Sequence, residues 1–136
     1  MGSRLAVESN GFALADSIVG DILVVTFTGA STDRNAEAMT RQYFEIVLAS
    51  GRKKVLADIR SLKGRLSTAK TYFLLRNLPV KPVPANIRTA LVESPENLRY
   101  AEFLENTAAN TGVYLSSFVD YDEALAWLDS GAGRER

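Results

Sequence analysis

The strongest constraint on the fold is that short β-branched runs alternate with amphipathic helical stretches along the whole chain. Helices with apolar residues three and four positions apart are expected to end near residues 50, 77, 111 and 130. Strands are expected at 12–19, 22–28, 55–59, 87–93 and 113–119. The order β-β-α-β-α-β-α-β-α predicts an α/β domain with a mixed, mostly parallel, five-stranded sheet and four helices.

Length and composition indicate one globular domain. The chain has 136 residues, of which 46% are hydrophobic and 24% are charged, as is ordinary for a globular protein. We expect residues 12–130 to form the domain, with 1–11 as a flexible lead-in and 131–136 as a frayed end. The longest apolar runs, such as 22–25, are far shorter than the roughly 20 residues that cross a bilayer. We therefore expect no transmembrane segment.

Histidine and cysteine are both missing from the sequence. Without them the chain lacks the usual general base, thiolate nucleophiles and the common ligands of zinc. The sequence also contains no phosphate-binding loop motif and no pair of carboxylates convincingly placed for acid–base catalysis. We therefore expect a non-enzymatic protein with no metal site and no cofactor. The lack of cysteine also suits a reducing cytoplasm, which is the expected location.

The charges are segregated, although the net charge is zero. Residues 51–88 contain ten basic residues and one acidic residue, a local balance of +9, so the rest of the chain carries −9. If these charges spread over several faces, they are merely solvated. If they gather on one face, they form a surface for an acidic partner or an anion. Nucleic acid is not expected, because no nucleic-acid-binding motif is present.

The start of the second helix is the candidate functional site. Ser67 or Thr68 can cap the helix, and a helix N-terminus also favours an added phosphate. Asp58 ends the strand 55–59, where ligands sit in open α/β sheets, although it could instead cap the following loop. With Ser67, four nearby cations would form an anion pocket or a docking site for an acidic partner. These cations are Arg60, Lys63, Arg65 and Lys70.

Several stretches, in order along the chain, carry a resemblance to a known family. They are residues 20–25 with Gly29, 54–60, 110–113 and 118–128. Over roughly residues 12–130 the chain resembles the STAS domains of anti-sigma-factor antagonists. It is more closely similar to the STAS-like group of small bacterial proteins that resemble stage II sporulation protein AA. The resemblance implies a STAS-like fold and a regulatory, protein-interaction role.

The resemblance also implies a modification site. In regulatory STAS proteins, an Asp-Ser-(Ser/Thr)-Gly run begins the helix after the central strand, and a partner kinase phosphorylates its first serine. Here Ser67 matches the phosphoacceptor and Thr68 matches its neighbour, whereas Leu66 and Ala69 replace the aspartate and the glycine. The implied mechanism is docking of an acidic partner, such as a kinase or regulator, or phosphate control at Ser67.

An alternative function stays open. The STAS-like group resembles lipid-binding CRAL-TRIO domains in fold, which implies a carrier or sensor of a small anionic or lipid ligand. The basic segment lies beside a proline-rich connection at 79–84, which could act as a lid. A homodimer formed through an edge strand or an exposed helix would be compatible with either function.

Overall fold

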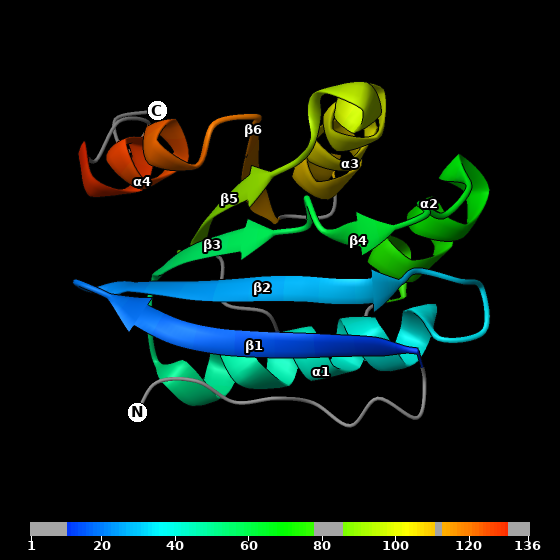
Figure 1. The fold of residues 1–136 in the computed structure, drawn as a ribbon, viewed down its shortest axis with the longest axis horizontal. Helices are drawn as coiled ribbons and strands as arrows, with labels where there is room; N and C mark the ends of the chain where they lie inside the picture. Colours follow the sequence, from blue (N-terminus) through cyan, green and yellow to red (C-terminus); the bar gives the residue numbers. More distant parts are fainter. Residues whose placement is uncertain (1–10, 78–85, 111–112, 131–136) are drawn as a thin grey trace.

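The computed structural model describes residues 11–77, 86–110 and 113–130. The proline-rich connection, residues 1–10 of the expected lead-in and the expected frayed end lie outside these ranges. The described residues form a sheet flanked by helices (Figure 1). In chain order, the elements are β1 (Phe12–Val19), β2 (Ile22–Ala30), α1 (Ala36–Ser50), β3 (Lys54–Asp58), β4 (Leu62–Lys63), α2 (Thr68–Arg76), β5 (Arg88–Val92), the 3₁₀ turn η2 (Pro95–Asn97), α3 (Leu98–Asn110), β6 (Tyr114–Phe118) and α4 (Tyr121–Ser130).

The sheet is mixed and mostly parallel, with the strand order β1-β2-β3-β5-β6. β1 and β2 form the expected antiparallel hairpin, in which Val19 pairs with Ile22 across the turn. The remaining pairings are parallel, so the predicted α/β class, the four helices and the strand arrangement are confirmed. The described sheet has six strands rather than five, because β4 pairs with the end of β2 inside the expected loop 60–66.

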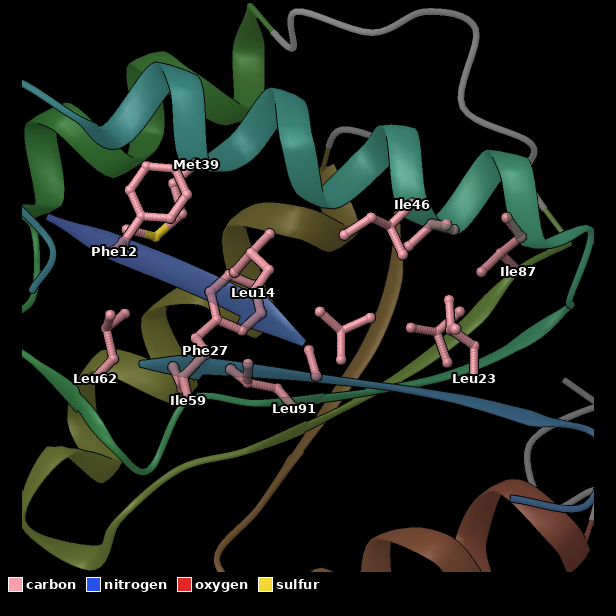
Figure 2. Close-up of a cluster of buried hydrophobic side chains, with 14 of the residues drawn as sticks. Phe12, Leu14, Leu23, Phe27, Met39, Ile46, Ile59, Leu62, Ile87 and Leu91 are labelled. Atoms are coloured by element: carbon pink, nitrogen blue, oxygen red, sulfur yellow. The ribbon is translucent and has the colours of Figure 1, made fainter. Parts of the chain in front are cut away.

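Apolar side chains fill both faces of the sheet. The larger cluster, shown in Figure 2, joins one face to α1 and α3 through residues such as Leu23, Met39 and Ala101. The smaller cluster joins the other face to α4 through Leu56 and Leu128, among others. Strands covered on both faces need few polar residues, which explains the uninterrupted apolar run within β3.

Candidate functional site

Two acidic residues lie at the carboxyl edge of the parallel strands, each at the end of one strand. Asp58 ends β3 and pairs with Val92 at the end of β5, and Glu93 follows directly. The backbone N–H of Ile59 donates to the carbonyl oxygen of Val92 at 3.0 Å, so the loop after β3 begins against β5. This edge, with the loop and the start of α2, is where ligands and partners meet open α/β sheets.

Arg65 and Glu93 form a buried ion pair across this edge. Nε and Nη2 of Arg65 donate to the two carboxylate oxygens at 2.7 and 2.6 Å, and Nη1 and Nη2 also donate to three backbone carbonyl oxygens of the loop. The Arg65 side chain is 9% exposed and that of Glu93 is 0% exposed. The sequence led us to expect Arg65 at the mouth of an anion pocket, but its guanidinium points inward and fastens the loop to the sheet.

Asp58 and Arg60 form a second, more exposed pair. Nε and Nη2 of Arg60 donate to the Asp58 carboxylate at 2.9 and 2.8 Å, and the backbone N–H of Arg60 donates to the same carboxylate at 3.1 Å. These hydrogen bonds raise the pKa of Arg60 above its usual value. The guanidinium also lies 5.5 Å from the centre of the Tyr121 ring. Asp58 therefore caps the loop after its strand, as one of the two interpretations of the sequence predicts.

Ser67 is the N-cap residue of α2. Its Oγ accepts the backbone N–H of Lys70 at 3.1 Å, and Thr68 is the first helical residue. This confirms the predicted helix start. Both residues are exposed at the surface. The first-turn N–H groups and the helix dipole would favour a phosphate attached at this end of the helix.

The outer face of α2, defined here as Lys70, Tyr72, Phe73 and Arg76, combines aromatic rings with cations. Tyr72 and Phe73 are 47% and 56% exposed. Nη1 of Arg76 donates to Oη of Tyr72 at 2.7 Å, and Nζ of Lys70 lies 5.8 Å from the centre of the Phe73 ring. Lys63 is also exposed and forms no ion pair with the described part of the chain. These cations give the helix and the preceding strand a positive, partly aromatic surface.

The basic segment 51–88 does not form one patch in the part of the chain that the structure describes. At the opposite end of β3, Nζ of Lys54 pairs with Asp21 at 3.2 Å. Arg88 begins β5, and its side chain donates to the backbone carbonyl oxygen of Trp127 at 2.9 Å. Its guanidinium also lies over the indole ring of Trp127, 4.3 Å from the centre of the ring. The charges are therefore divided between the two ends of the sheet, and some of them serve packing.

A cavity of about 170 Å³ lies between the sheet and α1, α2 and α3. α2 contributes Thr71, Leu74 and Leu75 to its wall, and the other described lining residues come mainly from α1, α3 and the strands. None of the described lining residues is charged. The cavity is therefore an apolar space directly beneath α2.

Two tyrosines give the cavity wall a few hydroxyl groups. Oγ1 of Thr71 donates to Oη of Tyr100 at 3.4 Å, and Tyr43 hydrogen-bonds the side chain of Thr89. Burial raises the pKa of Tyr43 to about 12 and raises that of Tyr100 above its usual value. Both phenols are therefore protonated at neutral pH, and they add hydrogen-bonding capacity without charge.

The arrangement favours binding over proton transfer. Each of the two carboxylates at the carboxyl edge is engaged by an arginine rather than free to act as a base. Within the described residues, no group of three or more acidic side chains could hold a metal ion.

No helix in the described ranges has the length and apolar composition needed to cross a membrane.

Sequence reasoning missed Glu93 and the cavity. Glu93 is the sole acid in the predicted strand 87–93, and a charge ending a buried strand was the available signal. Its partner lies 28 residues earlier in the chain, so no local pattern joins the two. The cavity depends on how three helices meet the sheet, and the sequence carries no signal for it.

Comparisons with known proteins establish the fold. No family model and no curated protein matches the sequence. The structure of an anti-sigma factor antagonist from Mycobacterium paratuberculosis matches with a TM-score of 0.63 and 13% identity, covering 89% of this chain and 97% of that chain. An uncharacterised DUF3478-family protein with a SpoIIAA-like fold, from Shewanella loihica, matches with a TM-score of 0.54 and 21% identity, covering 87% and 93%. The expected STAS-like fold is thereby confirmed.

Proposed function

We propose that this chain is a non-enzymatic, cytoplasmic regulatory module that binds a protein partner through the outer face of α2, with Ser67 as its point of phosphate control. The observation that carries the proposal is the exposed Ser67 hydroxyl at the start of a helix with exposed aromatic rings and cations. The shared fold with an anti-sigma factor antagonist supports a regulatory role.

The chemistry of this surface favours an acidic partner. Lys63, Lys70 and Arg76 supply positive charge, which steers a complementary acidic surface. Tyr72 and Phe73 supply the exposed aromatic area that contributes most at protein interfaces. A phosphate on Ser67 would add about −1.5 to −2 charges at neutral pH at the start of the helix that carries Lys70 and Arg76. Phosphorylation would therefore weaken the attraction for an acidic partner.

Site-specific photo-crosslinking tests the docking surface. A photoreactive amino acid replaces Phe73 in one variant and the exposed apolar Ile18 in a control, and both are expressed in the native cell. We expect one protein with an acidic surface to crosslink at position 73 and not at position 18. The crosslink should weaken in the Ser67→Asp variant. Equal crosslinking at both positions, or none at position 73, would contradict the proposal.

Phosphate control has its own test. The purified protein is incubated with native cell lysate and ATP, and phosphosites are mapped by mass spectrometry. We expect a phosphate on Ser67, with Ser67→Ala as the control and Thr68 as the neighbouring hydroxyl to be distinguished. Modification found only outside residues 60–72 would refute this part of the proposal without touching the docking surface.

A second candidate function is that of a carrier or sensor of a small ligand, as the alternative interpretation of the sequence predicts. The cavity of about 170 Å³ beneath α2 favours it. The uncharged wall suits an apolar ligand better than an anion, because a buried unpaired charge is costly. Native mass spectrometry of the freshly purified protein tests it: a bound small molecule is expected, and a clean unliganded mass contradicts it.

A further inference from the structure

A single helix separates the cavity from the proposed docking surface. α2 has nine residues, and its buried members are Thr71 and Leu74. These two residues and Leu75 face the cavity, whereas Tyr72 and Phe73 are exposed on the outer face. Anything that fills the cavity therefore contacts the same helix that the partner would bind.

The cavity wall restricts the chemistry of an occupant. No described lining residue is charged, and the polar groups of the wall include the hydroxyls of two pairs, Thr71–Tyr100 and Tyr43–Thr89. A charged ligand would lose its hydration with no opposite charge to replace it. A neutral ligand loses little hydration, and one hydroxyl or carbonyl group on the ligand could still hydrogen-bond to the phenol of Tyr43 or Tyr100.

The volume restricts the size of the occupant. An engineered cavity of about 150 Å³, lined by apolar side chains, stays dry and binds benzene. The cavity beneath α2, at about 170 Å³, is slightly larger, and it is partly open to solvent rather than enclosed. A neutral, largely apolar molecule with one aromatic ring fits this space, whereas most drug-sized ligands need roughly 300 Å³ or more.

The helices that line the cavity differ in how much they depend on it. α1 has fifteen residues and packs on the sheet through Met39, Ile46 and Val47. α2 is shorter, and isolated helices of fewer than about 12 residues are marginal without tertiary packing. Empty space beneath α2 removes contacts that would otherwise hold it. A ligand in the cavity would therefore stabilise α2 more than α1.

We propose that a neutral molecule the size of one aromatic ring binds beneath α2 and controls the docking surface by ordering this helix. The binding site is independent of the proposed function, whereas its regulatory consequence rests on it. A ligand that binds only when α2 is packed makes openings of the helix rarer by a factor of 1 + L/Kd, where L is the free ligand concentration. A partner that needs the ordered outer face would then bind more tightly, and the effect would be reciprocal.

Binding is tested with toluene as the probe, followed by amide NMR of the full chain. We expect saturable shifts at cavity-lining residues. Leu104→Trp fills the cavity from α3 and should abolish them, whereas Leu98→Trp, an exposed position on the same helix, should leave them unchanged. If Leu104→Trp fails to fold, Leu66→Trp fills the cavity from the loop instead. Absence of saturable shifts, or shifts that survive in the filled variant, would overturn the site.

The coupling is tested by hydrogen exchange on the same protein. In the free protein we expect α2 amides to exchange faster than those of α4. Toluene at ten times its Kd should slow α2 exchange about tenfold, and Leu104→Trp should remove this effect. Unchanged α2 exchange at saturation would overturn the coupling. Neither measurement involves a partner, so a failed crosslink at Phe73 would refute the docking surface and leave these results standing.

Discussion

α2 and α4 are nearly equal in length, with nine and ten residues, yet they are anchored in different ways. α4 buries Leu128 completely, Asp120 caps its first turn, and Arg88 bonds the carbonyl oxygens of its last turn. α2 buries Thr71 and Leu74 above a cavity and exposes two aromatic rings. From this difference we expect α4 to be the fixed helix and α2 to be the helix that responds to what fills the cavity.

The largest expected effect concerns the ion pair before α2. Glu93→Gln leaves the Arg65 charge buried without its counter-charge, and breaking such a pair costs about 3–5 kcal/mol. Asp58→Asn is the matched control: the Asp58 side chain is 10% exposed but that of Arg60 is 42% exposed, so water partly screens this pair and we expect a smaller loss than for Glu93→Gln. Urea unfolding followed by circular dichroism measures both. Equal losses of unfolding free energy in the two variants would show that burial does not make the Arg65–Glu93 pair more important for stability than the Arg60–Asp58 pair.

Truncation of one leucine on each helix tests the comparison directly. Leucine-to-alanine changes in cores cost about 2–5 kcal/mol, depending on the space they leave. Leu128→Ala should fall in the upper half of this range, because its site is closely packed. Leu74→Ala should lie near the lower end, because it already borders a cavity. A larger loss for Leu74→Ala in urea unfolding would reverse the assignment of fixed and responsive helices.

Alkaline pH should lower the free energy of unfolding through Tyr43, a tyrosine of the cavity wall. The pKa of Tyr43 is raised to about 12 in the folded protein, whereas an unfolded tyrosine titrates near 10. Between these pH values the folded state holds a proton that the unfolded state has lost. Stability is therefore fully present below pH 10 and falls by about 1.4 kcal/mol per pH unit up to pH 12.

Two phenylalanine variants isolate this contribution. Tyr43→Phe should reduce the decline in stability over the alkaline range, measured by urea unfolding at several pH values, and Tyr100, whose pKa burial also raises, should account for part of the decline that remains. Tyr72→Phe, which removes an exposed phenol from α2, is the control and should retain the decline. A wild-type slope in Tyr43→Phe would show that another group causes the alkaline loss.

The smallest expected effect lies at the start of α2. Ser67→Ala removes the side-chain bond to the N–H of Lys70 and should cost about 1 kcal/mol. Thr68→Ala should cost less, because Thr68 is exposed and lies within the helix rather than at its cap. Ser67→Asp should preserve stability, since aspartate caps helices as well as serine. A loss in Thr68→Ala that exceeds that in Ser67→Ala would place the cap one residue later.

Much of the fold could be predicted because its signals are local. The β-branched run of β2, the Gly20-Asp21 turn and the serine before α2 each act within a few residues. β4 escaped prediction because two residues cannot establish a period, and Leu62 alone points into the core.

The candidate site was less predictable because its chemistry depends on distant partners. Arg60 and Arg65 look alike in the sequence, but one lies partly in solvent on Asp58 and the other is buried on Glu93. Ser67 was predictable because a helix cap is a local feature. The cavity and the exposed aromatic rings above it required the assembled tertiary structure.

The buried Arg65 has a practical consequence for protein engineering. The sequence of residues 59–66 is that of a loop between β3 and α2. In the structure, however, the Arg65 side chain hydrogen-bonds three carbonyl oxygens of this segment and pairs with Glu93, which fixes the geometry of the segment. An inserted epitope or reporter would break that geometry, so this segment should be as intolerant of insertion as a core strand. The exposed turn at Gly20-Asp21 is held more loosely, because its one ion pair in the described structure, Asp21 with Lys54, is partly exposed, and this turn offers the safer position for a tag.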